Sequence, residues 1–161
     1  MAQPEHVPVD DLERQVIRNV NEYGWHCVNV IEDDGHPPWT FTIGFHDTWN
    51  FPELIVIGRS RATAHHILET VANGLDHDRR LDFTTTAFTL LPGTPCHFIE
   101  VAERYYSDYV GFARWYYRRR QFPLYQIVWP NNDGHYPWSP GATKAFKEWQ
   151  PMLGAPKTGE W

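Results

Sequence analysis

The feature that most limits the fold of this chain is the short apolar run Glu53-Leu-Ile-Val-Ile-Gly58. Polar and apolar residues do not alternate in it, which is typical of a β-strand that is covered on both faces. Such a strand lies inside a sheet and needs other elements packed above and below it. The run therefore predicts a central strand, with the carboxylate of Glu53 at the mouth of the core.

An amphipathic helix is predicted before this run. Asp10 or Asp11 can cap its start, and Gly24 can end it. Five apolar residues between these points share one helical face and are expected to face the core: Leu12, Val16, Ile17, Val20 and Tyr23.

Two further helices are expected after the central run. Ser60 can cap the first, which carries an apolar stripe from Ala64 to Leu75. The second is predicted from about Asp108 to Arg120, where the terminal arginines would meet the negative end of the helix dipole. Rings and cations at 116–120 can clamp phosphates, but a solvated helix end is the favoured interpretation of this segment.

Strand patterns and turns account for most of the remaining residues. Besides the central run, strands are expected at 25–32, 39–46, 81–91, 96–102 and 122–129. The turn-forming segment Asp33–Pro38 joins the first two as a hairpin. The predicted fold class is α+β: one curved, mainly antiparallel β-sheet, about three packed α-helices and an irregular C-terminal wrap rich in Trp and Pro.

The length of 161 residues predicts a single domain over 1–161, with flexible ends at 1–9 and 155–161. The net charge of −6 disfavours nucleic acid as a partner. No apolar stretch reaches the roughly 20 residues that span a bilayer, so no membrane association is expected. Two isolated cysteines, Cys27 and Cys96, are expected to be buried free thiols, and the predicted location is the cytoplasm.

The strand predicted at 39–46 offers a polar face. Since side chains alternate along a strand, Thr40, Thr42, Gly44 and His46 should lie on the face opposite the core. Gly44 would allow a ligand or another backbone to approach closely. A solvated face with a bulge at Gly44 is the alternative.

Glu53 follows this strand. Burial would raise its pKa toward that of a general acid or base, although it can equally pin the preceding loop through backbone N–H groups.

The C-terminal part concentrates aromatic, amide and proline residues in the loop Gln126–Pro140 and at Gln150. Trp129 and Trp138 can form apolar walls of a ligand site, and both glutamines can supply hydrogen bonds. Asp133 and His135 are added to Glu53 and His46 as acid/base candidates. The same residues can instead bury themselves and hold the C-terminal segment on the core.

Metal and nucleophile signatures are sparse. His65 and Glu69 have i, i+4 spacing, but the chain has no HExxH motif and no Cys/His framework, so no metal site is predicted. There is also no GxSxG elbow, phosphate-binding loop or GxGxxG motif.

Several short motifs in a fixed order resemble a known bacterial family. They are Gly24-Trp25, Phe41-Thr-Ile-Gly-Phe45, Pro52-Glu-Leu-Ile-Val-Ile-Gly58, Gln126-Ile-Val-Trp-Pro130, Asp133-Gly134, Pro137-Trp138 and Gln150-Pro-Met-Leu-Gly154. Their succession, from about residue 23 to 154, is similar to domain of unknown function 4262 (DUF4262). Members often carry an aspartate where this chain has Asn131. The resemblance implies a bacterial cytosolic protein and supplies no reaction.

Three functional hypotheses follow. The first is a small-molecule site, hydrolytic or acid/base, between the Thr40–His46 strand and the Gln126–Pro140 loop. The second is an acidic protein-binding module, such as an immunity or regulatory factor that masks a basic partner. The third is a flavin-binding, oxidoreductase-like domain, by analogy with small strand-rich folds. The sequence does not indicate an oligomeric state.

Overall fold

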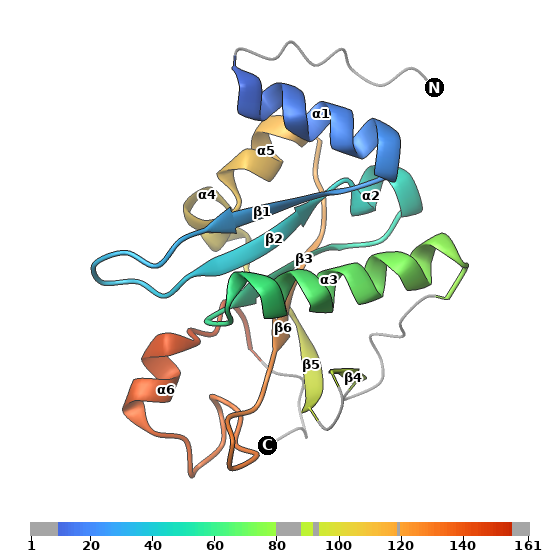
Figure 1. Cartoon of the computed structure of the whole chain (residues 1–161). Coiled ribbons are helices and arrows are strands. Elements are labelled where there is room, and N and C mark those ends of the chain that lie inside the picture. Colours follow the sequence, from blue (N-terminus) through green and yellow to red (C-terminus); the bar gives the residue numbers. More distant parts are fainter. Residues whose placement is uncertain (1–9, 80–87, 92–93, 119, 156–161) are drawn as a thin grey trace.

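A computed structural model describes residues 10–79, 88–91, 94–118 and 120–155 (Figure 1). Six strands form one sheet in the order β1-β2-β3-β6-β5-β4. Their bounds are β1 His26–Val30, β2 Trp39–Ile43, β3 Glu53–Ile57, β4 Phe88–Leu91, β5 Thr94–Glu100 and β6 Leu124–Val128. Every neighbouring pair is antiparallel except β3 and β6, which run parallel. The predicted α+β class with a mainly antiparallel sheet is confirmed.

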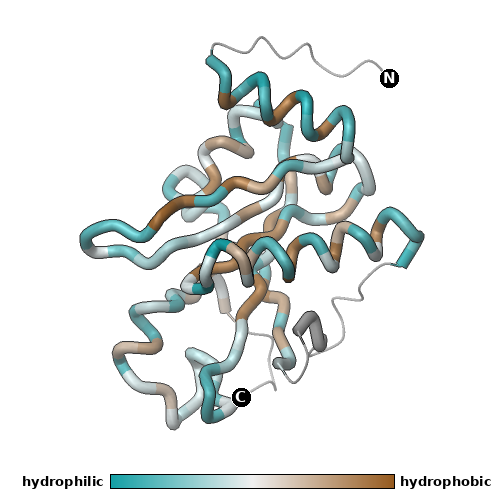
Figure 2. Tube along the Cα trace, viewed as in Figure 1, coloured by the Kyte–Doolittle hydropathy of each residue, from teal (hydrophilic) through white to brown (hydrophobic). Residues whose placement is uncertain are grey.

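The apolar run forms the interior strand β3, as predicted, and all five of its residues are buried. Leu54 and Val56 belong to the core on one face of the sheet, and Ile55 and Ile57 belong to the core on the other. Figure 2 shows hydrophilic and hydrophobic residues alternating along the helices that cover these faces. A strand whose only polar residue is Glu53 therefore has apolar partners on both sides.

Helices cover both faces of the sheet. α1 (Asp11–Tyr23), α4 (Tyr106–Tyr109) and α5 (Gly111–Tyr117) pack on one face, and α3 (Arg61–Asp76) packs on the other. The predicted caps are confirmed for two helices. Asp10 accepts the Glu13 N–H at 2.8 Å, Gly24 ends α1 at φ 90°, and Ser60 accepts the Thr63 N–H. None of the helices in the described ranges combines the length and apolar character needed to cross a membrane.

The strand predicted to reach His46 ends earlier, at Ile43. Gly44 has φ 111°, a left-handed conformation that ends the extended backbone, and the short helix α2 (Phe45–Trp49) follows. A Cβ at Gly44 would lie 2.7 Å from the carbonyl oxygen of Gly24. Gly44 and His46 therefore do not continue the polar face of β2, because the close approach of another backbone turns the chain at Gly44.

The single helix predicted from 108 to 120 is divided and shorter. A 3-10 turn at Glu103–Tyr105 and α4 precede α5, which ends at Tyr117, where Arg118 takes φ 56°. The C-terminal wrap also contains a short helix, α6 (Lys144–Trp149), which the sequence pattern does not predict.

The apolar face predicted for α1 is only partly buried. Val16 and Val20 contact the core, whereas Leu12 and Tyr23 are 63% and 67% exposed. The physical reason is that α1 lies over the edge of the sheet beside β1, so only its middle turns reach the core.

Three sequence predictions lie outside the described residues: the strand residues 81–87, the turn residues 92–93, and the flexible ends 1–9 and 155–161 except Ala155. Both cysteines are free thiols, as predicted; Cys96 is buried, whereas Cys27 is only half-buried.

Candidate functional site

The side chain of Glu53 is fully buried at the start of β3 and accepts five hydrogen bonds. Three come from consecutive backbone N–H groups where β2 passes into α2: Gly44 (3.1 Å), Phe45 (3.2 Å) and His46 (3.1 Å). The Thr42 hydroxyl donates to Oε1 at 2.7 Å, and the Tyr117 hydroxyl donates to Oε2. Both carboxylate oxygens are thus fully used by groups of the protein.

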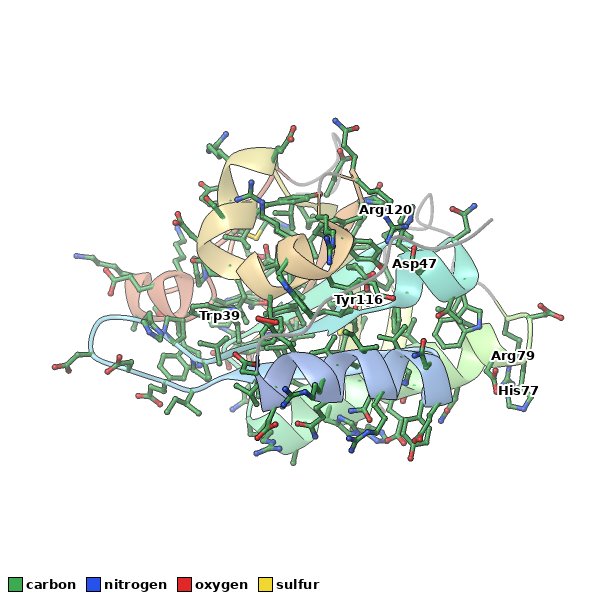
Figure 3. All side chains as sticks on the ribbon, turned by 90° about the horizontal axis from the view of Figure 1, so that it is seen from above. Trp39, Asp47, His77, Arg79, Tyr116 and Arg120 are labelled. Carbon is green, nitrogen blue, oxygen red and sulfur yellow. The ribbon has the colours of Figure 1, made fainter. Side chains whose placement is uncertain are left out.

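This network continues to the surface through an ion pair. The Arg120 guanidinium donates two hydrogen bonds to the Asp47 carboxylate, at 2.7 and 3.1 Å, and lies over the Tyr117 ring. Figure 3 shows Asp47 and Arg120 pointing toward one another beside Tyr116. The Asp47 N–H also donates to the Tyr117 hydroxyl at 3.4 Å. The turn at Gly44, β3 and the end of α5 are therefore joined through polar contacts around Glu53.

Burial raises the pKa of Glu53 to about 7, and the hydrogen bonds that it accepts oppose this shift only in part. The pKa of Tyr117 is also raised, by burial and by the neighbouring Glu53 carboxylate. A carboxyl with such a pKa can exchange a proton near neutral pH. Among the described residues, however, neither Glu53 nor Tyr117 lines any of the three grooves reported below.

Gln126 and Gln150, both predicted to bind a ligand, hold the C-terminal segment. Gln126 donates to the Pro151 carbonyl and accepts the Leu153 N–H, both at 2.9 Å. Gln150 accepts the Trp129 N–H at 3.0 Å and donates to the Trp129 carbonyl at 2.9 Å. Both amides are fully buried, so these four bonds fasten the segment after α6 to β6 and the residue that follows it.

The two tryptophans predicted as ligand walls lie in different surroundings. Trp129 is buried and donates its indole N–H to the Ile57 carbonyl at 2.8 Å. Trp138 stacks on Tyr136, with ring centroids 4.9 Å apart, and meets the edge of His97 on β5. The prediction that these rings form one site with the polar face of β2 has no contact to support it in the described residues.

The remaining predicted site residues are also dispersed. Thr40 is buried and donates to the Asn29 side chain at 3.0 Å. Asp133 is exposed on a turn, and its N–H donates to Asn131. His135 lies against Gly141 in the same loop. The structure therefore brings Thr42, Gly44, His46 and Glu53 together and keeps the C-terminal residues apart from them; a ligand-binding role for either set stays a prediction.

A groove follows the outer edge of β1, the terminal strand of the sheet. Its wider part encloses about 1010 Å³ between α1, β1 and α3, and the adjoining part encloses about 610 Å³. Both parts share the residues Gln15, His26, Cys27, Asn29 and Arg61, so the groove is continuous. Figure 1 shows α1 and α3 on opposite sides of β1. We call this feature the β1 groove.

Exposed apolar side chains lie along the β1 groove, with Tyr23 in the wider part and with Leu12 and Ile31 in the adjoining part. Of the four large hydrophobic residues that are exposed in the described part of the chain, three line it: Leu12 (63%), Tyr23 (67%) and Ile31 (80%). The fourth, Trp149, donates its indole N–H to the Gly58 carbonyl at 2.6 Å. Three of the four exposed large hydrophobic residues in the described part of the chain therefore line one groove.

No motif in the sequence marks this groove. The helical period places Leu12 and Tyr23 on the core face, and Ile31 lies in a predicted strand. The sequence does contain one indication of an edge strand, because the polar residues His26 and Asn29 interrupt an otherwise apolar strand.

A third groove, of about 770 Å³, lies beside the end of α5. Arginine and glutamate side chains both line it, namely Arg114, Arg118, Arg120, Glu100 and Glu103. No group of three His, Cys, Asp or Glu side chains within the described ranges is arranged to hold a metal ion.

Comparison with known families gives one match. The family model described as "Domain of unknown function (DUF4262)" matches residues 19–143. The chain belongs to this family. The matched part of this DUF4262 protein contains the whole Glu53 network and β1, but it begins within α1 and ends before Gln150. Neither the curated proteins nor the solved structures gave a match.

Proposed function

We propose that this DUF4262 protein is a protein-binding module that takes an extended segment of a partner into the β1 groove. The observation that carries this proposal is that Leu12, Tyr23 and Ile31 are exposed and all line the groove beside the edge strand β1. Main-chain hydrogen bonds would give affinity, and the apolar side chains would give specificity.

The geometry of β1 suits strand addition. Because β1 is terminal in the sheet, one row of its N–H and C=O groups faces away from β2. At about 3.3 Å per residue, the five residues of β1 offer roughly 17 Å of backbone. A partner segment of about five to seven residues would match this length.

The walls of the groove favour a single strand over a second copy of this chain. Residues of both α1 and α3 line the wider part, so helices border the edge of β1 on both faces of the sheet. A second sheet would bring its own flanking helices against these walls, whereas an isolated strand would not. The net charge of −6 favours a basic partner, because opposite charges on two surfaces attract one another.

The alternative of an acid/base site has less support. It is favoured by one observation, the pKa of about 7 at Glu53. Yet both Glu53 oxygens already accept hydrogen bonds from the protein, and the amides of Gln126 and Gln150 are engaged with backbone groups. A substrate would have to displace these contacts.

The test is selection of binding peptides from a library of random dodecapeptides, followed by affinity measurements with fluorescence anisotropy. Two groove variants, Tyr23→Glu and Ile31→Glu, are compared with Ala145→Glu, which adds the same charge on the exposed face of α6. All three positions are exposed, so each change should alter stability by no more than about 0.5 kcal/mol.

We expect the groove variants to bind the selected peptides at least about tenfold more weakly, and Ala145→Glu to bind them as the wild type does. Failure to select any peptide would overturn the proposal, and so would equal binding by all variants. A dimer of the wild type that Ile31→Glu dissociates would instead assign the groove to a second copy.

A further inference from the structure

The two faces of β1 carry different side chains in the adjoining part of the β1 groove. Val28 and Val30 are half-buried and pack against the core under α1, so we call their side of the strand the α1 face. Leu12 of α1 and Phe112 of α5 line the groove with them. The polar groove residues of this face also line the wider part, namely Gln15 and His26. Beside Val28 and Val30, the α1 face is therefore apolar.

The opposite side of β1, which we call the α3 face, carries a polar group. Cys27 packs against the core under α3, and Asn29, two residues further along the strand, points to the same side. Asn29 lies directly opposite Thr40 of β2, whose hydroxyl donates to Asn29 Oδ1 at 3.0 Å. Within the described residues, the amide NH2 of Asn29 has no hydrogen-bond acceptor, and the side chain lines both parts of the groove. This donor is available to a partner.

A strand added to β1 would meet both faces in turn. Residues directly opposite one another on neighbouring strands point to the same side, with their Cβ atoms about 4.5–5.5 Å apart. Partner residues opposite Val28 and Val30 would therefore lie on the apolar α1 face, and the residue between them would lie beside Asn29. The order of these three positions is the same in both directions, so it holds for a parallel and for an antiparallel partner.

We infer that the partner segment contains a triplet in which two apolar residues flank one residue whose side chain accepts hydrogen bonds. The apolar residues lie opposite Val28 and Val30, and the acceptor, an oxygen of Asn, Gln, Ser, Thr, Asp or Glu, takes the Asn29 NH2. This inference rests on the proposed function and specifies its partner. Lysine and arginine accept no hydrogen bond, so either one in the middle position would leave the Asn29 donor covered and unpaired.

The experiment repeats the dodecapeptide selection with the full-length variant Asn29→Asp. The carboxylate keeps the oxygen that accepts the Thr40 hydroxyl and replaces only the NH2 donor by an acceptor. Asn132→Asp is the control, because it makes the same change at an exposed position outside the β1 groove. Urea unfolding of each variant establishes that it is folded before the selection.

We expect peptides selected by the wild type and by Asn132→Asp to share the triplet, without lysine or arginine in its middle position. Peptides selected by Asn29→Asp should keep the two apolar residues and carry lysine or arginine between them. Leucine in the middle position of the tightest wild-type peptide should weaken its binding to the wild type about tenfold, because the Asn29 donor would then be covered without an acceptor.

Two other results would overturn the inference in different ways. If the selected peptides depend on Ile31 but lack the triplet, or if Asn29→Asp leaves their middle residue unchanged, the inference is wrong and strand addition stands. If no selected peptide loses affinity with Ile31→Glu, the proposed function fails together with the inference.

Discussion

Replacing Glu53 by glutamine should reveal what its five hydrogen bonds contribute. The amide keeps the size of the carboxyl but puts an NH2 group where one oxygen accepts backbone N–H groups. At Oε1 it would face Phe45, and at Oε2 it would face Gly44 and His46. A protonated carboxyl keeps a lone pair on both oxygens, whereas the NH2 group accepts nothing. One buried N–H without an acceptor costs about 1–3 kcal/mol.

The cost of this substitution should depend on pH. The pKa of Glu53 is raised from 4.5 to about 7 by burial, so the folded state holds this proton more tightly than the unfolded chain. The resulting stability is fully present below pH 4.5 and is lost as the pH rises through about 7. The shift corresponds to about 3 kcal/mol. Glu53→Gln lacks this dependence.

Urea unfolding followed by tryptophan fluorescence at pH 4 and pH 8 measures both effects. Glu53→Gln should be less stable than the wild type by about 1–3 kcal/mol at pH 4, and the difference should vanish or reverse at pH 8. Glu148→Gln, exposed on α6, serves as the control and should change stability by less than about 0.5 kcal/mol. A deficit of Glu53→Gln that grows with pH would refute this reasoning, because it would mean that the five donors lower the pKa of Glu53 below its usual value.

Two further substitutions test the contacts that shape the fold. Gln126→Ala should lower the free energy of unfolding by about 2–4 kcal/mol, because the buried Leu153 N–H loses its acceptor, whereas the exposed Gln121→Ala should be nearly neutral in the same urea titration. Gly44→Ala should cost at least about 2 kcal/mol, since its Cβ would meet a backbone carbonyl at 2.7 Å with φ at 111°, while Gly111→Ala, with no atom within 4 Å of its Cβ, should leave the urea midpoint unchanged.

The sequence correctly predicts those elements whose apolar pattern and caps match the way in which they pack. β3 has no polar position except Glu53 and is buried throughout. The stripe of α3 and its Ser60 cap likewise match the structure. The end of β2 could not be predicted in this way, because Gly44 leaves the strand to approach the backbone of Gly24, which is a tertiary contact.

The candidate site residues were likewise predictable only in part. The pattern places Thr42 and Glu53 near one another, since Glu53 closes the loop that follows the strand of Thr42. Gly44 joins them through its backbone N–H, because it leaves that strand. The pattern does not show that their polar atoms satisfy one another. The β1 groove could not be predicted from the sequence. The helical pattern places Val16 and Tyr23 on the same face of α1, but only Val16 lies over the sheet, whereas Tyr23 lies past its edge.

Amide hydrogen exchange of β1 with and without a selected peptide is the most direct test of strand addition. Peptide binding should slow exchange at alternate residues of His26–Val30, those whose N–H groups face away from β2. Unchanged exchange in β1, with slowing confined to the Gln126–Pro140 loop, would contradict the proposal and return the binding site to the C-terminal residues.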